Sequence, residues 1–159
     1  MKKFLYLLTV LAVSFPLVLS AQSGPSSPVS DVLDLYGNTG NYSYLSAEGE
    51  DIDSFFADMA DEDAPAFNTE YIDRIVLLQI SQDDMDENEL EIFFDQIDTA
   101  VESGNYILVE ETDEYIQYIA MDDSSGGEES VREIVEIIFG EDEMLVLSLI
   151  GNIPVNELL

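Results

Sequence analysis

The chain has 159 residues, a length that suits one domain. It contains no Cys and no His, which excludes disulfides, transition-metal sites with Cys or His ligands, and nucleophiles of the Ser-His or Cys-His kind. Its 35 acidic residues against four basic ones give a net charge of −31, which excludes nucleic acids and anionic membrane surfaces as partners because both are bound through Lys and Arg.

Residues 1–21 have the three parts of a secretory signal peptide. Lys2 and Lys3 form a short positive start, the apolar run "FLYLLTVLAVSFPLVL" follows, and small residues offer a cleavage site after Ser20 or Ala21. The run is interrupted by a proline and is shorter than the ~20 residues that a membrane span needs. We therefore expect export to the periplasm or the extracellular space, without a lipid anchor on cysteine.

Cleavage of this leader changes the charge balance further. The mature chain keeps only Arg74 and Arg132 against 35 acidic residues, a net charge of −33 (2 − 35). The acids are interleaved with periodic apolar residues, which predicts a folded domain rather than a disordered chain. Such a surface fits either a high-salt habitat or cation binding, and we expect both arginines to pair with nearby acids.

The rest of the chain divides by composition. Residues 22–28, "QSGPSSP", have the composition of a flexible spacer. Residues 29–159 are predicted to form a single α+β domain, in which 29–70 is an N-terminal extension and 71–159 is the core.

Short elements are expected in the extension. Ser30 is predicted to cap a short helix that ends at Gly37, and turn residues lead from it to a short strand at Tyr42–Leu45. In "EDIDSFFADMAD" the apolar residues recur at helical spacing, which predicts a second helix whose Phe55 and Phe56 face the core.

Regular elements are expected in the core. "IDRIVLLQI" predicts a strand, Glu87–Ser103 predicts a helix with Gly104 just past its end, and "NYILVEE" and "YIQYIAMD" predict a hairpin. After "SSGG" a second helix is predicted, followed by the last strand, "EMLVLSLIGNI". On that second helix the apolar residues that share one face are Val131, Ile134, Val135 and Ile138, and Gly140 ends it.

The resulting order is β-α-β-β-α-β, the ferredoxin-like arrangement of an antiparallel sheet with both helices on one face. The first and last strands are apolar on both sides, as strands buried on two faces are. The helix-free face therefore needs a cover. The N-terminal extension is the first candidate for that cover, and self-association with a second copy of the chain is the alternative.

The leader, "VLDLYGNTGNYSYLS", the strand and helix order and above all "EDEMLVLSLIGNI" make the chain similar to one group of proteins. It resembles the small exported bacterial proteins of domain-of-unknown-function family 4252, over most of the mature chain. The resemblance implies export and a shared fold. It implies no activity and no site residues.

The acidic stretch "DDMDENELEIFFD" is the candidate metal site. Asp84, Asp86 and Asn88 match the first three ligand positions of a calcium-binding EF-hand loop. The match then fails, because Glu89 stands where the loop needs Gly and Asp95 where it needs a bidentate Glu. We favour a structural role, in which Asp86 caps the following helix and Glu89 closes a capping box.

Aromatic residues recur in the predicted helix and hairpin of the core. Phe93 and Phe94 lie on the apolar face of their predicted helix and are expected in the core. The hairpin tyrosines offer either a ligand surface or, as we favour, cross-strand contacts; they are Tyr106, Tyr115 and Tyr118.

These residues indicate an exported, acidic, non-catalytic module of the cell envelope that binds an unknown protein or small molecule and carries no cofactor. An enzyme is disfavoured because His, Cys and mature Lys are missing. The alternative functions are the binding of a hard cation such as calcium and, less favoured, a carboxylate-dependent hydrolase.

Overall fold

A computed structural model describes residues 25–59, 68–81, 84–122 and 130–155, so the predicted signal peptide and residues 22–24 of the predicted spacer lie outside the described residues. None of the described helices is long and apolar enough to cross a membrane. The helices are α2 (Pro28–Gly37), α3 (Glu50–Met59) and α4 (Glu87–Ser103), with a 3-10 turn at Thr69–Tyr71. The strands are β1 (Ser43–Glu48), β2 (Ile72–Ser81), β3 (Ile107–Glu111), β4 (Tyr115–Met121), β5 (Ser130–Phe139) and β6 (Glu143–Pro154).

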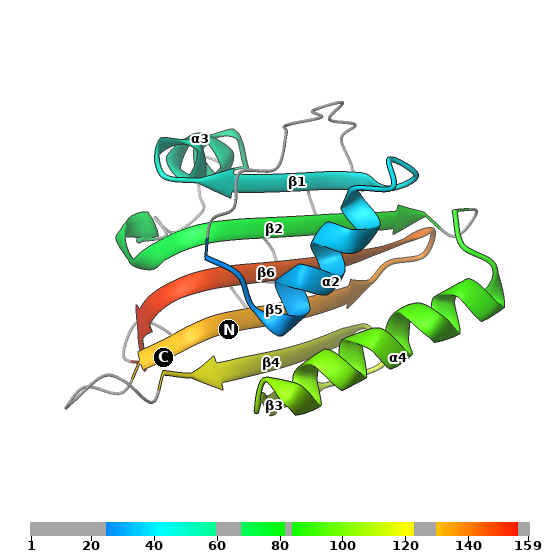
Figure 1. The fold of residues 1–159 in the computed structure, drawn as a ribbon. Helices are drawn as coiled ribbons and strands as arrows, with labels where there is room; N and C mark the ends of the chain where they lie inside the picture. Colours follow the sequence, from blue (N-terminus) through cyan, green and yellow to red (C-terminus); the bar gives the residue numbers. More distant parts are fainter. Residues whose placement is uncertain (1–24, 60–67, 82–83, 123–129, 156–159) are drawn as a thin grey trace.

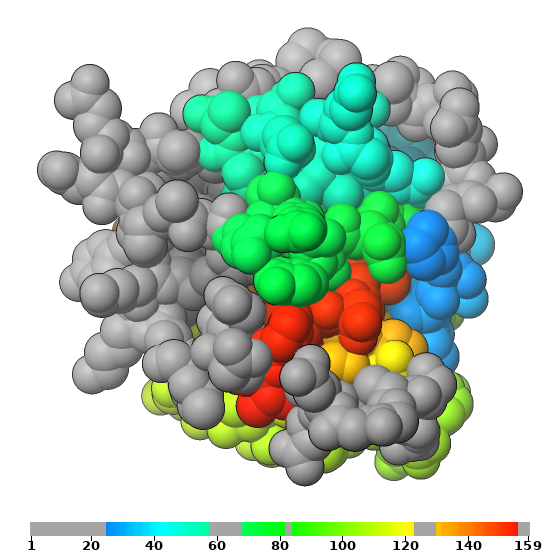
Figure 2. All heavy atoms as spheres, turned by 90° about the vertical axis from the view of Figure 1, so that its left-hand side faces the viewer, coloured from blue at the N-terminus to red at the C-terminus, as the bar shows by residue number. Residues whose placement is uncertain are grey.

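The six strands form one sheet in the order β1-β2-β6-β5-β4-β3, and every neighbouring pair is antiparallel. The α+β class is confirmed (Figure 1). From the side, the colours follow the sheet order, with the red of β6 between the green of β2 and the orange of β5 (Figure 2). The predicted extension is part of this sheet, since β1 pairs with β2 along its whole length.

The second helix predicted for the core, which carries Val131 to Ile138, is wrong, because residues 130–139 form the strand β5. Half of the ten residues of β5 are valine or isoleucine, which lose side-chain freedom in a helix and pack well on a sheet. The strand lies between β4 and β6 and is buried on both faces, so its apolar residues do not alternate with polar ones. An apolar pattern without alternation fits a helical spacing by coincidence.

This correction changes the topology. After β2 the described chain runs α4-β3-β4-β5-β6, so βαββββ replaces the expected ferredoxin-like βαββαβ order. The strands from β3 to β6 follow one another as an antiparallel meander, and β6 closes it by pairing with β2. No parallel strand pair remains within the described sheet.

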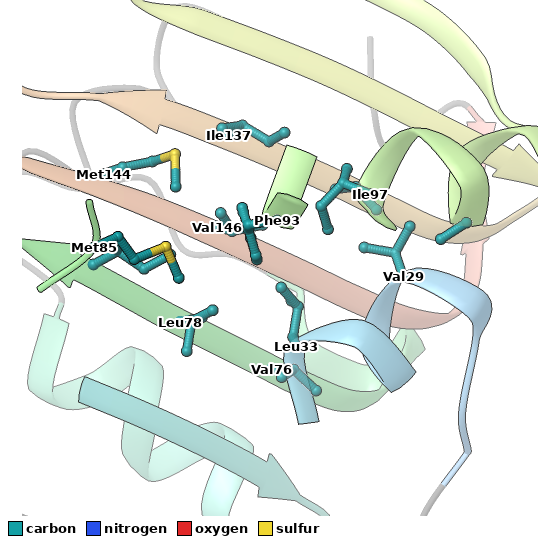
Figure 3. Packing of buried hydrophobic residues seen from close by; sticks show 13 residues of the cluster. Val29, Leu33, Val76, Leu78, Met85, Phe93, Ile97, Ile137, Met144 and Val146 are labelled. Atoms are coloured by element: carbon teal, nitrogen blue, oxygen red, sulfur yellow. The ribbon is translucent and has the colours of Figure 1, made fainter. Parts of the chain in front are cut away.

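Helices α2 and α4 cover one face of the sheet (Figure 1). Between them and the sheet lies the first core, in which Phe93 and Ile97 of α4 meet Leu33 of α2 over side chains of the central strands (Figure 3). Phe93 is fully buried and its ring meets that of Tyr36 edge-on, with 4.9 Å between the ring centroids. The apolar side chains of this first core are removed from water on folding, so the core is a main source of the stability of the fold.

Helix α2 begins earlier than predicted. Its N-cap is Ser27 rather than Ser30, and Pro28 occupies the first turn, where its missing N–H costs nothing. The two serines form a reciprocal capping box: the Ser27 hydroxyl accepts from the Ser30 amide at 3.0 Å, and the Ser30 hydroxyl accepts from the Ser27 amide at 2.8 Å. The end of the predicted spacer is therefore structured, and its Ser27 is buried.

The opposite face of the sheet carries a second core. Its buried residues are Ala47, Ile52, Ile72, Ile75, Leu77, Val131, Ile134, Leu145, Leu147, Leu149 and Ile153. Of the described helices, α3 packs here, through Ile52, Phe55 and Phe56. From the sequence, the N-terminal extension is expected to cover the sheet face opposite the core helices, and α3 does so. For α2 this expectation is wrong, because α2 lies beside α4 on the other face.

Candidate functional site

The acidic segment before α4 is a helix start, as its capping pattern predicts. The Asp86 carboxylate accepts from the Glu89 amide at 2.9 Å, and the Glu89 carboxylate accepts from the Asp86 amide at 3.0 Å. Asp84 turns back and accepts from the Ser81 amide at 3.1 Å. Asn88 lies in the first turn of the helix and is exposed. Asp84 and Asp86 thus each accept from a backbone amide, and no group of three or more His, Cys, Asp or Glu side chains that could hold a metal ion occurs among the described residues.

Arg74 anchors α2 to the sheet. It is buried on β2, and its guanidinium donates to both carboxylate oxygens of Asp34, at 2.8 and 3.0 Å. Its Nε also donates to the hydroxyl of Ser46 at 3.1 Å, and the carboxylate oxygen Oε1 of Glu48 lies 3.6 Å from the same nitrogen. Tyr44 donates to Asp34 as well, and its burial, followed by that hydrogen bond, raises the pKa of Tyr44 to about 12. This cation is used in the fold and is enclosed, so it is no open anion site.

Glu133 is a fully buried carboxyl on the face of β5 that α2 and α4 cover. The hydroxyl of Ser148 donates to it at 2.6 Å, and the phenol of Tyr106 donates to it from the turn after α4. Burial raises the pKa of Glu133, and these two hydrogen bonds oppose that rise.

Glu136 is the corresponding carboxyl on the other face of β5. It accepts from the phenol of Tyr115 at 2.8 Å and from the amide of Gln117 at 3.1 Å, both on β4. Only 2 % of its surface is exposed, and this burial raises the pKa of Glu136 from 4.5 to about 7. The expected cross-strand role is confirmed for Tyr115, which reaches a carboxyl on the neighbouring strand.

These two carboxyls cannot act together on one substrate. Val135 and Ile137, which alternate with Glu136, lie in the first core, whereas Ile134 lies in the second, so Glu133 and Glu136 point to opposite faces of the sheet. Each carboxyl is also enclosed by its own donors. A glycosidase-like acid and base would have to face the same bond, so this pair does not form one.

Of the two edge strands of the described sheet, β1 and β3, the strand β3 is the more exposed. It pairs only with β4, and all of its residues are exposed. Its apolar side chains Ile107, Leu108 and Val109 are 52, 48 and 39 % exposed. In Figure 1, β3 lies behind α4, at the edge of the sheet opposite β1 and α3. A free sheet edge offers unpaired backbone N–H and C=O groups along its length, and here apolar side chains accompany them.

Carboxylates flank this apolar edge. Glu110 and Glu111 complete β3, and Asp113 and Glu114 follow in the exposed turn to β4. A bulge between Leu108 and Glu110 breaks the register with β4 at this point. Bulges and charges are devices that protect sheet edges from unspecific pairing, and both occur at this edge. We call Ile107–Glu111 the β3 edge.

No protein-family model, curated protein or solved structure matches the chain.

Proposed function

We propose that the protein is an exported, non-catalytic interaction module that binds another protein through the β3 edge. The carrying observation is that every residue of this five-residue edge strand is exposed, including three consecutive large apolar side chains. Elsewhere among the described residues, the large apolar side chains with comparable exposure are the isolated Leu35 and Ile92 on two helices. Isolated exposed apolar residues are ordinary, whereas an apolar sheet edge is a ready template for strand addition.

The net charge of the chain supports a role in recognition, and its first residues support a place outside the cell. A net charge of −31 keeps the protein soluble and steers oppositely charged partners toward it. The leader-like residues 1–21 support export. Mass spectrometry of the protein from its own host tests this: we expect a mature chain that begins after Ser20 or Ala21, and a chain that retains Met1 would contradict export by cleavage.

Photo-crosslinking in the cell that makes the protein tests the interaction site. A photo-reactive amino acid replaces Leu108 on the β3 edge or, as a matched control, Leu35 on α2, which is 59 % exposed. We expect discrete crosslinked products from position 108 that are missing from position 35. An absence of products at 108, or the same products at both positions, would rule out the β3 edge as the binding surface.

A further inference from the structure

The chemistry of the β3 edge also indicates what kind of segment it accepts. Along β3 the side chains change from apolar, at Ile107, Leu108 and Val109, to acidic, at Glu110 and Glu111. A strand that pairs with this edge therefore meets an apolar half and an anionic half. Neighbouring side chains across a strand pair interact directly, so the partner needs apolar residues opposite the first half and cations opposite the second.

The direction of pairing follows from the sheet. All neighbouring strands of the described sheet are antiparallel, and antiparallel pairs are slightly more stable per residue than parallel ones. A segment that runs antiparallel to β3 meets Glu111 and Glu110 first and Ile107 last. Its own sequence must therefore begin with basic residues and end with apolar ones.

A second copy of this chain does not fit. It would bring its own Glu110 and Glu111 to the same edge, and two molecules with a net charge of −31 each would repel one another. The chain has no lysine after its leader-like start, and one of its two later arginines, Arg74, is buried against Asp34. The cations that the edge requires must come from a different protein.

Resting on the proposed function, we propose that the β3 edge captures an extended segment of a basic protein partner as a seventh, antiparallel strand, with two cationic residues preceding three apolar or β-branched ones. The backbone of the segment pairs with the free edge of β3 and supplies affinity, and its cations pair with Glu110 and Glu111 and supply direction and selectivity.

Three labelled peptides test this inference by fluorescence anisotropy against the full chain: Lys-Lys-Val-Thr-Val, its acidic counterpart Glu-Glu-Val-Thr-Val, and the reversed order Val-Thr-Val-Lys-Lys. We expect the first peptide to bind at least about fivefold tighter than either of the others, and the preference to shrink in molar salt, because exposed ion pairs are modest and screened. Equal affinity for all three peptides, or no binding of any, would overturn the inference.

A charge-reversed variant provides the matched control. In Glu110→Lys/Glu111→Lys both substitutions are at exposed positions, and thermal unfolding verifies that the variant is folded. We expect this variant to prefer the acidic peptide, whereas an unchanged preference for the basic one would place the binding site elsewhere.

Failure of this inference can be told apart from failure of the proposed function. Crosslinks at Leu108 in the cell without charge-dependent peptide binding would retain the interaction site and refute the basic partner. Sedimentation showing a salt-resistant dimer crosslinked through Leu108 would instead identify a second copy as the occupant and overturn the inference. Without crosslinks and without peptide binding, both proposals fail.

Discussion

Replacing Glu136 with glutamine should make the protein less sensitive to pH. The carboxyl of Glu136 accepts hydrogen bonds from Tyr115 and Gln117 and is 2 % exposed. In Glu136→Gln the amide oxygen can accept the same two bonds, and the shape of the side chain hardly changes. What the substitution removes is the ability of this buried group to ionise.

The size of the effect follows from the raised pKa. Between its ordinary value of 4.5 and the folded value of about 7, the carboxyl of Glu136 is ionised in the unfolded chain but still protonated in the fold. The folded state then binds more protons, so the free energy of unfolding falls as the pH rises. The contribution is full below pH about 4.5, is lost as the pH passes about 7, and amounts to about 3 kcal/mol in total.

Urea unfolding at fixed ionic strength between pH 5 and pH 8 measures this effect. The free energy of unfolding of the wild type should fall by about 2 kcal/mol more over this range than that of Glu136→Gln. Glu133, whose pKa is raised in the same direction, is present in both proteins and cancels in the comparison. Glu91→Gln, on the exposed side of α4, should follow the wild type.

Parallel pH profiles of the wild type and Glu136→Gln would refute this reasoning. They would mean that Glu136 reaches solvent in the folded protein, which is what a helix at residues 130–139 would allow. The measurement therefore also tests whether β5 is a buried strand.

Three further predictions concern the rest of the fold. Arg74→Ala should lower the free energy of unfolding by about 2–4 kcal/mol, because it leaves the carboxylate of Asp34 without its cation, and Arg74→Lys should recover part of that loss. If urea unfolding shows a loss below ~1 kcal/mol for Arg74→Ala, the anchoring role of Arg74 is contradicted. Asp86→Ala should cost about 1 kcal/mol as a lost cap, with the same thermal response to millimolar calcium as the wild type; a calcium response abolished by the substitution would restore the metal site. The melting temperature should rise by several degrees between ~0.1 M and ~1 M NaCl, because the screening length falls from ~10 to ~3 Å. Magnesium should raise the melting temperature as effectively as calcium. A melting temperature that does not change with NaCl would contradict a repulsive surface.

Elements with strong local signals could be predicted from the sequence. Helix α4 has the predicted bounds, because its apolar stripe, the capping box from Asp86 to Glu89 and the terminal Gly104 all act within a few residues. The β3–β4 hairpin likewise follows from two short β-rich runs joined by a tight turn.

Strand β5 could not be predicted in this way. A strand buried on both faces loses its polar alternation, and Glu133 and Glu136, three residues apart, imitate the polar side of a helix. The buried carboxyls were missed for the same reason. The run of β-branched residues in "SVREIVEIIF" was the one local signal that favoured a strand.

The candidate site depends on sheet order, which local patterns do not contain. "ILVEE" is an ordinary β-strand sequence, and the same residues in the middle of the sheet would be covered on both sides. The pairing of the strands places β6 between β2 and β5, and this strand order leaves β3 at an edge of the sheet. That placement makes Ile107, Leu108 and Val109 part of an exposed surface.

Hydrogen exchange of the β3 amides, followed by NMR with and without the Lys-Lys-Val-Thr-Val peptide, tests the central claim most directly. Strand addition predicts that the outward-facing amides within Ile107–Glu111 exchange at least tenfold more slowly in the complex, while the amides of the opposite edge strand, β1, keep their rates. Unchanged exchange along β3 in a complex that protects β1 or the helices instead would contradict the assignment of the β3 edge as the binding surface.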